Sequence, residues 1–487
     1  MSKLDPLPGL SPYPLQDYYD EMFADARRVR PHYGPVNRMF AGMSPEELQA
    51  KQRQIQRRMM EEGITFTLYN PAQDQPMERT IPFDMIPRVI SRQEWDTLEA
   101  GIVQRITALN LFIHDVYHEQ YIVKDGVIPR RFILSNVYFR PEMAGLRVPG
   151  GSYITTSGID LIRHRDGRYY VLEDNLRTPS GFSYLFKGRS LMNQLFPELS
   201  LSSSIRDVDH SLNRFLSVLR SLSPSRSGDP VIALLTPGEY NSAYYEHAFL
   251  AQQMGIHLVE GRDLVVQDHK VYLKFMNGLR KVDVLYRRID DDYIDPLAFQ
   301  PNSLLGVAGL MNAYRAGHVA IANAPGTGVA DDKAMYTYVP EMIRYYLREE
   351  PILPNVPTYV LSRPEERRLA LEHIEEMVIK ETSLSGGYGM LIGSEATREQ
   401  KEEFRLKILA EPDRYIAQPI MSLSRAPVLT DGVMQPRHID LRAFVLMGAD
   451  RKPHVIPGGL TRVAMREGSL VVNSSQGGGV KDTWVLA

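Results

Sequence analysis

Residues 158–181 read GIDLIRHRDGRYYVLEDNLRTPSG, and this stretch decides how the rest of the chain is interpreted. Two apolar-rich runs flank Asp166-Gly167, and such a dipeptide between strand-like runs is the strongest short-range signal for a β-hairpin. With a symmetric turn around these two residues, the register places Asp160 opposite Glu173. Asn175 follows two residues later on the same face of the strand.

Two carboxylates that face each other across a β-ladder repel and destabilise the sheet unless a positive charge offsets them. A hard divalent cation would do so, because Mg²⁺ prefers oxygen ligands and is commonly held by one or two carboxylates plus substrate phosphates. The side chains of Asp160, Glu173 and Asn175 are therefore a predicted magnesium site. The hairpin alone is equally consistent with a solvated sheet face whose charges repel only weakly, since an asymmetric turn would change the pairing.

A second informative stretch is MVIKETSLSGGYGMLIG at residues 377–393, which predicts a buried strand, a Ser/Gly loop and another strand. Glycine lets the backbone approach an anion closely, and Lys380 on the first strand would neutralise a phosphate. The stretch lacks the Gly-Lys-Ser/Thr ending of a Walker loop and the spacing of a dinucleotide fingerprint. Strand-loop-strand is typical of a nucleotide lid, although a ligand-free turn explains the loop equally well. The loop residues concerned are Ser385, Gly386, Gly387 and Gly389.

Two C-terminal segments add candidate anion binders. In RHIDLRAFVL (437–446), alternation places His438, Asp440 and Arg442 on one strand face. Residues 458–481 supply a further set: Arg462, Asn473, Gly477, Gly478, Gly479 and Lys481. Each segment alone is also consistent with surface charges or a flexible turn. Opposed carboxylates, a glycine loop and arginines in one chain together favour phosphoryl chemistry.

Composition excludes several other classes. The 487 residues include 56 Lys+Arg and 59 Asp+Glu, a formal net charge of −3, which gives no electrostatic reason to expect nucleic acid as a partner. The chain has no cysteine, so a cysteine nucleophile and thiolate metal ligands are excluded. No window approaches the ~18 uninterrupted apolar residues of a membrane span, so we expect no membrane partner and a cytoplasmic location.

The order of motifs resembles a known family. From residue 331 the chain contains Asp332-Lys333, PILPNVPTYV, VIKETSLSGGYGMLIG, YIAQPI, DLRAFVL, Arg462 and NSSQGGG. This order resembles that of the ATP-grasp carboxylate–amine ligases, in which a hairpin of the form G-[IV]-D-L … E-x-N-x-x-P comes last. Here that hairpin comes first, at 158–181. The chain therefore resembles the bacterial circularly permuted ATP-grasp proteins, which are related to eukaryotic-type glutathione synthetases and glutathionylspermidine synthetases.

The resemblance, which covers residues 95–487, implies a role for each candidate residue. Asp160, Glu173 and Asn175 would hold Mg²⁺, and Lys333 and Lys380 would contact the phosphates of ATP. Residues 385–389 would close over those phosphates. Gln418 to Ile420 would form the hinge on which adenine sits, read mainly by backbone groups. Arg442, Arg462 and Asn473 would steady the transferred phosphoryl group, and Lys481 is a weaker candidate.

The expected fold is mixed α/β, a circularly permuted ATP-grasp fold with an open α/β domain. The segment 221–229, SLSPSRSGD, is the clearest linker. After it, VIALLTP, a helix over 242–254 and IHLVEG predict a β-α-β unit, with further strands at 271–275, 282–286 and 319–323. We predict four parts: a mostly helical N-terminal extension (1–94), a permuted ATP-grasp segment with the hairpin (95–222), a pre-ATP-grasp α/β domain (228–325) and a nucleotide-binding domain (326–487).

The function implied by the resemblance is an ATP-dependent ligase like glutathionylspermidine synthetase. It would join a small-molecule or peptide carboxylate to an amine through an acyl phosphate. Those peptide-forming synthetases carry an arginine just before the first magnesium aspartate, where this chain has Ser157-Gly158-Ile159, so the substrate is left open. Two alternatives remain: a phosphotransferase acting on another acceptor, and a nucleotide-binding scaffold without turnover. Nothing in the sequence indicates the oligomeric state.

Overall fold

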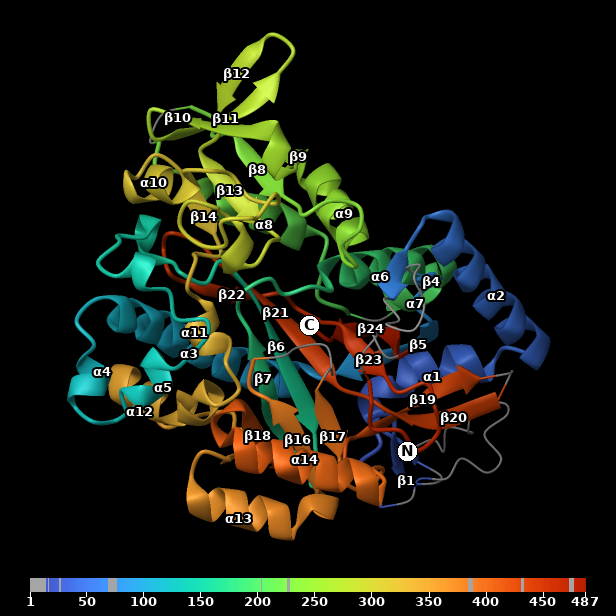
Figure 1. Cartoon of the computed structure of the whole chain (residues 1–487). Helices are drawn as coiled ribbons and strands as arrows, with labels where there is room; N and C mark the ends of the chain where they lie inside the picture. Colours follow the sequence, from blue (N-terminus) through green and yellow to red (C-terminus); the bar gives the residue numbers. More distant parts are fainter. Residues whose placement is uncertain are drawn as a thin grey trace.

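The fold is organised around an antiparallel sheet with strand order β22-β21-β6-β7 (Figure 1). The hairpin strands β6 (Thr156–Arg163) and β7 (Tyr169–Asn175) join β21 (Leu441–Met447) and β22 (Pro453–Val455). Strand β6 pairs with β21 antiparallel, so segments almost 300 residues apart in the sequence form one sheet. A hairpin that precedes its partner strands in the chain is the arrangement that a circular permutation predicts. The computed structural model describes residues 15, 17–25, 28–68, 77–202, 204–225, 228–383, 389–430, 433–472 and 477–487.

The hairpin is confirmed, and so is the pairing of Asp160 with Glu173. The assumption of a symmetric turn was wrong, because Arg163 pairs with Tyr169 and Gly167 closes the turn with a left-handed φ of 82°. A β-bulge directly after Asp160 shifts the register by one residue. These two departures from a regular hairpin cancel, and the carboxylates therefore face each other as expected.

A second antiparallel sheet, of order β15-β18-β16-β17, lies beside β7 and carries the predicted nucleotide residues (Figure 1). Its strands are β15 (Tyr359–Val360), β18 (Tyr415–Pro419), β16 (Met377–Glu381) and β17 (Met390–Ile392). Helices α13 (Pro364–Glu372) and α14 (Arg398–Ala410) cover its outer face. Buried Ile379, Ala417 and Ile408 belong to one apolar cluster between the sheet and these helices. The predicted strand-loop-strand stretch is therefore present as β16 and β17.

The predicted β-α-β unit after the linker is confirmed. Strand β8 (Ile232–Leu235), helix α9 (Tyr244–Met254) and β9 (His257–Val259) belong to a parallel sheet of order β14-β13-β8-β9. The other two strands are β13 (Val284–Arg287) and β14 (Ala320–Ala322), and α8 (His210–Ser221) and α10 (Leu310–Arg315) lie beside them.

The strand predicted at 271–275 belongs elsewhere. It is β11 (Lys270–Phe275), the middle strand of a separate antiparallel sheet with β10 (Leu264–Gln267) and β12 (Gly278–Lys281). Short turns join these three strands, and antiparallel neighbours need only such turns, whereas a parallel neighbour needs a long crossover. In Figure 1 this small sheet projects from the end of the molecule that carries β8 and β9.

The N-terminal segment, which we expected to be mostly helical, contains both helices and strands. It contains α1 (Gly34–Ala41) and α2 (Pro45–Glu61), and Ser44 caps α2 in a capping box with Glu47. It also contains β1 (Phe23–Asp25), β2 (Arg28–Val29), β3 (Thr65–Leu68), β4 (Met77–Thr80) and β5 (Phe83–Ile90). Strand β5 pairs in parallel with β24 (Gly479–Val485), which also pairs with β23 (Thr461–Val463). The two ends of the chain thus share one sheet; the four predicted domain ranges stay a prediction.

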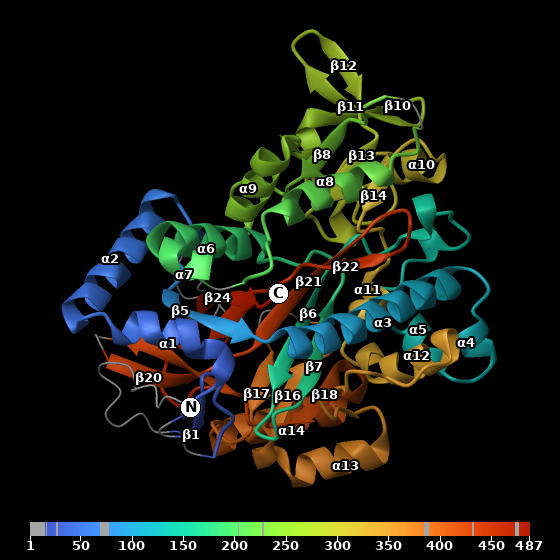
Figure 2. The same ribbon diagram turned by 180° about the vertical axis from the view of Figure 1, so that it is seen from behind.

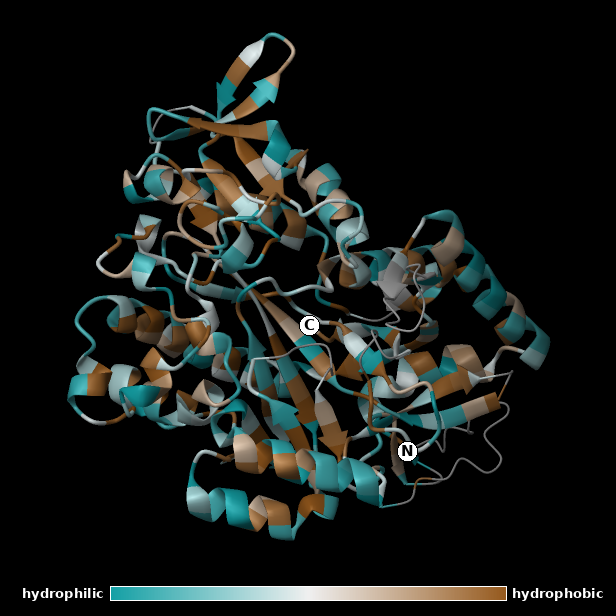
Figure 3. Cartoon of the chain, viewed as in Figure 1, coloured by the Kyte–Doolittle hydropathy of each residue, from teal (hydrophilic) through white to brown (hydrophobic). Residues whose placement is uncertain are grey.

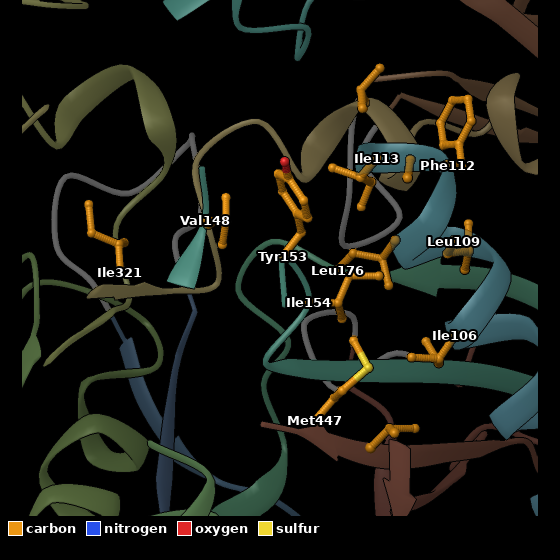
Figure 4. Close-up of a cluster of buried hydrophobic side chains, with 14 of the residues drawn as sticks. Ile106, Leu109, Phe112, Ile113, Val148, Tyr153, Ile154, Leu176, Ile321 and Met447 are labelled. Atoms are coloured by element: carbon orange, nitrogen blue, oxygen red, sulfur yellow. The ribbon is translucent and has the colours of Figure 1, made fainter. Parts of the chain in front are cut away.

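The largest apolar cluster lies between helix α3 (Arg92–Tyr117) and the central sheet (Figure 2). Figure 4 shows Ile106, Leu109 and Phe112 of α3 in this cluster together with Met447 of β21. The cluster also contains Ile321 of β14, so the central sheet and the parallel sheet share a core. Burial of an aliphatic side chain contributes about 1.5–3 kcal/mol, and a shared core therefore fixes how these sheets sit together.

The remaining helices and strands complete the outer parts of the molecule. They are α4 (Tyr121–Lys124), α5 (Arg131–Leu134), α6 (Phe182–Leu195), α7 (Pro197–Ser202), α11 (Gly328–Asp331), α12 (Val339–Leu347), β19 (Arg425–Thr430) and β20 (Val433–His438). Figure 3 shows apolar colouring along the central strands and a largely hydrophilic α2. In the described part of the chain, no helix combines the length and the apolar character that crossing a bilayer requires.

Candidate active site

A small cleft lies where β7 meets the sheet that contains β16 and β18. It brings together four residues predicted from four separate stretches of sequence: Glu173, Lys333, Lys380 and Gln418. Its other lining residues are Leu172, Asp174, Ala330, Asp331 and Tyr336. The cleft is the place where the predicted metal and nucleotide residues meet.

Lys380 lies on β16 and points into this cleft. Its Nζ donates a hydrogen bond to Gln418 Oε1 at 2.8 Å. Burial lowers the pKa of Lys380 to about 8, although the nearby Glu173 carboxylate opposes this effect. A partly buried, protonated lysine that donates to a neutral amide keeps its charge available for an anion such as phosphate.

The predicted hinge residues lie at the end of β18. Gln418 points its side chain into the cleft, which the sequence interpretation, based on backbone groups, did not anticipate. The Ile420 N–H donates to the Glu376 carbonyl at 2.8 Å. This N–H is engaged within the protein, which argues against its use in binding adenine.

Asp160 is buried and bound by two arginines. Arg442 donates from Nε and Nη2 to its two carboxylate oxygens at 2.6 and 2.8 Å, and Arg462 donates from Nη2 at 2.7 Å. Burial alone would raise the pKa of Asp160, but the two guanidinium groups outweigh it and hold the pKa below its ordinary value. The chain itself therefore supplies positive charge to the carboxylate for which a cation was predicted.

Gly158 makes room for this arrangement. It lies on β6 next to Arg442 of β21, and a Cβ at this position would lie 3.1 Å from the Arg442 Cδ. The side chain of Arg442 therefore crosses the backbone where a larger residue would obstruct it. This packing gives a physical reason for the glycine in Ser157-Gly158-Ile159.

Arg462 connects Asp160 with a second buried carboxylate. It donates from Nε to Asp440 Oδ1 and Oδ2 at 2.9 and 3.1 Å, and its Nη2 contacts both aspartates. Burial and the neighbouring Asp160 carboxylate raise the pKa of Asp440. The single strand expected over 437–446 is interrupted: β20 ends at His438, which contacts Arg425, and β21 begins at Leu441. Asp440 lies between the two strands and shares Arg462 with Asp160.

Glu173 and Asn175 form the exposed side of the predicted metal site. The Glu173 side chain is 29% exposed, and its Oε1 lies 3.9 Å from Arg442 Nη2. Asn175 donates from Nδ2 to the Gly158 carbonyl at 3.2 Å, which leaves its Oδ1 available as a ligand atom. These oxygens suit Mg²⁺, which is commonly held by one or two carboxylates with substrate phosphates. Within the described ranges, no group of three or more His, Asp or Glu residues could hold a metal by itself.

Tertiary contacts tie the strand that carries Lys380 to the segment that carries Lys333. The Lys333 N–H donates to the Thr382 carbonyl at 3.4 Å, and the Tyr138 hydroxyl donates to the Ser383 carbonyl. Arg177 lies over the Tyr138 ring at 4.0 Å and donates from Nε to Asp331 at 2.6 Å. The roles of Tyr138 and Arg177 were not predictable from the sequence, because no local pattern indicates that they meet.

Several candidates lie outside this cluster or outside the described residues. The latter group consists of Ser385, Gly386, Gly387 and Asn473. Gly389 is described and has a left-handed φ of 64°. Two further basic residues, at and directly after the end of β13, have structural partners: Arg287 donates to the Asn323 and Ile289 carbonyls, and Arg288 donates to the Pro179 carbonyl.

Lys481 is not an anion binder, which corrects the sequence interpretation. It is 1% exposed, lies 2.8 Å from Asp84 Oδ1 and donates to the Pro427 carbonyl. We expect Lys481→Met to lower the free energy of unfolding by about 3–5 kcal/mol, because it leaves the Asp84 carboxylate buried without its charge partner. Chemical denaturation measures this loss. If the Lys481→Met variant kept its stability but lost nucleotide affinity, Lys481 would instead belong to the binding site.

Comparison with known proteins identifies the family. The model of the circularly permuted ATP-grasp type 2 family matches residues 87–464. The chain belongs to this family. It is 50% identical to an uncharacterized protein of Synechocystis over 98% of both chains. It is 41% identical to a Frankia alni protein named as a candidate glutamate–cysteine ligase, over 98% of this chain and 55% of that one.

A solved structure supports the fold. The glutathione synthetase-like effector of Globodera pallida, in its apo form, matches with a TM-score of 0.56 over 91% of this chain and 98% of that chain. At 12% identity this likeness concerns the fold alone. The predicted circularly permuted ATP-grasp fold is confirmed by the family match and by the joining of β6 to β21.

Proposed function

We propose that this chain is an ATP- and Mg²⁺-dependent carboxylate–amine ligase that works through an acyl phosphate, as glutathionylspermidine synthetase does. The observation that carries the proposal is the convergence of Glu173, Lys333, Lys380 and Gln418 on one cleft. Membership of the ATP-grasp family and the name of the Frankia relative support ligase chemistry. Because this chain spans about half of that relative, its substrates are not assigned from the name.

The chain's residues divide the work of binding between them. Lys333 and Lys380, which both line the cleft, would bind the ATP phosphates. Glu173 and Asn175 would hold Mg²⁺, which when bound offsets phosphate charge. Arg442 and Arg462 would stabilise the transferred phosphoryl group from the Asp160 side. Positioning and electrostatic stabilisation are the main contributions a protein makes to phosphoryl transfer.

The proposed reaction has two balanced steps. A substrate carboxylate oxygen bonds to the γ-phosphorus as the bond to the ADP oxygen breaks, giving an acyl phosphate and ADP. The amine nitrogen then bonds to the acyl carbon, phosphate leaves and the amine loses a proton. Shielding from water matters because an acyl phosphate hydrolyses readily.

Oxygen labelling tests the reaction class. With a library of ¹⁸O-carboxylates and amines, we expect ADP release to depend on both components and one ¹⁸O to appear in the released phosphate. ADP release with a non-carboxylate acceptor, without transfer of label, would contradict the ligase and indicate a phosphotransferase. If the protein binds Mg-ATP but no member of the library increases ADP release, the chain is a nucleotide-binding scaffold without turnover.

Nucleotide affinity is expected to depend on the charge of Lys380. Because the pKa of its side chain is about 8 in the ligand-free protein, the lysine is charged below this pH and becomes neutral above it. We therefore expect ADP affinity to fall by up to about tenfold per pH unit above pH 8. Calorimetry between pH 7 and 9.5 measures this change. Lys380→Met should remove the dependence, and an identical pH profile in the variant would contradict the assignment.

A further inference from the structure

Three side chains, two on β16 and β18 and one directly before β15, form a continuous hydrogen-bonded relay at the cleft. Lys380 Nζ of β16 donates to Gln418 Oε1 of β18 at 2.8 Å. Gln418 Nε2 donates to Thr358 Oγ1 at 2.9 Å, and the Thr358 hydroxyl donates to the Val356 carbonyl at 2.9 Å. Each polar group in this relay therefore has a partner.

The relay fixes which way the Gln418 amide points. A hydroxyl has one proton, and that of Thr358 is donated to the Val356 carbonyl, so its oxygen accepts from the amide. The NH₂ group of Gln418 therefore faces Thr358, and its carbonyl oxygen faces Lys380. A lysine ammonium has only donors, and this orientation gives it the acceptor it needs.

The relay is anchored to the hairpin. The Val356 N–H donates to the Val171 carbonyl at 2.9 Å, and the Tyr336 hydroxyl also donates to that carbonyl. Val171 lies two residues before Glu173 on β7. The position of Lys380 is thereby linked, through Gln418 and Thr358, to the strand that carries the predicted metal residues.

We propose that Gln418 is a positioning residue, which aims the Lys380 ammonium into the cleft for phosphate binding and is itself oriented by Thr358. This inference rests on the proposed function, because it concerns the nucleotide site of the same cleft. It assigns to the Gln418 side chain a role that differs from contact with adenine.

The neutrality of the Gln418 side chain matters because charged groups already surround Lys380. The carboxylates of Glu173 and Asp160 attract its ammonium, and Lys333 and Arg462 repel it. The two further aspartates that line the cleft are engaged: Asp174 binds Arg105, and Asp331 binds Arg177. A neutral acceptor orients the lysine and leaves its charge available, whereas a carboxylate at position 418 would form an ion pair with it.

A double-mutant cycle separates positioning from direct adenine contact. ADP and adenosine affinities are measured without metal for wild type, Gln418→Leu, Lys380→Met and the double variant. We expect Gln418→Leu to weaken ADP binding by roughly tenfold and adenosine binding by less than about twofold. In the Lys380→Met background, the same substitution should change ADP affinity by less than about twofold.

Thr358 supplies the matched controls. Thr358→Ser keeps the hydroxyl and should bind ADP like wild type, whereas Thr358→Val breaks the relay and should behave like Gln418→Leu. If Gln418→Leu does not fold, Gln418→Glu replaces it and should also weaken ADP more than adenosine. Equal losses for ADP and adenosine, or additive effects in the cycle, would overturn the positioning role. A wild-type protein that does not bind ADP would overturn the proposed function as well.

Discussion

Glu173→Gln is expected to lower library-dependent ADP release by about a thousandfold or more while leaving the fold intact. The Glu173 side chain is 29% exposed and makes no short ion pair, so its carboxylate contributes little to stability. Loss of a magnesium ligand removes several kcal/mol of transition-state stabilisation, and each 1.4 kcal/mol is about tenfold in rate. Turnover and the melting temperature are measured on the same samples.

Glu381→Gln is the matched control for this variant. Glu381 follows Lys380 directly on β16, so its side chain points to the opposite face, where it lies 3.0 Å from Arg414. We expect turnover within about twofold of wild type. A Glu173→Gln enzyme with normal activity, or a Glu381→Gln enzyme with an equal loss, would contradict the assignment of Glu173 to the metal.

Asp160→Ala is expected to lower the free energy of unfolding by about 3–5 kcal/mol. Asp160 is 1% exposed, and its removal leaves the guanidinium groups of Arg442 and Arg462 buried with fewer partners. Chemical denaturation measures the loss. Asp166→Ala is the control in the same hairpin, because Asp166 lies in the turn and pairs with the exposed Arg168. This substitution should lower the free energy of unfolding by less than about 1 kcal/mol. Equal, small losses in the two variants would contradict the arginine network.

The arginine network bears on how Asp160 serves the site. Three guanidinium hydrogen bonds occupy most of the roughly four acceptor positions that a carboxylate offers. Glu173, which lines the cleft, and the partly buried Asn175 are better placed to receive a metal ion with its phosphates. Asp160 binds Arg442 and Arg462 beside the predicted metal site. It therefore has a structural role whether or not it also contacts the metal ion.

Much of the fold could be predicted from the sequence. The hairpin, the β-α-β unit and the permuted order of motifs follow from local turn chemistry and from hydrophobic patterning. The pairing of Asp160 with Glu173 was correct for a partly wrong reason, since a bulge compensated for an asymmetric turn. Bulges leave little signal in a single sequence, and agreement at one pair therefore did not establish the register elsewhere.

The site was less predictable, because its contacts join distant segments. Arg442 and Arg462 were recognised as anion binders, but their shared partner Asp160 was assigned only to a metal. Lys481 follows a glycine-rich stretch of the kind that binds anions, so the sequence suggested an anion-binding role. Only the structure shows that its side chain is buried beside Asp84. The side-chain role of Gln418 depends on Thr358, 60 residues earlier, and no spacing rule connects them.

The most direct test of the central claim is a crystal structure with Mn²⁺ and a non-hydrolysable ATP analogue, recorded at a wavelength where manganese scatters anomalously. We predict an anomalous peak about 2–2.5 Å from an oxygen of Glu173, with the nucleotide phosphates between Lys333 and Lys380. A nucleotide bound elsewhere, or a manganese ion with no ligand from β6 or β7, would contradict the proposed site.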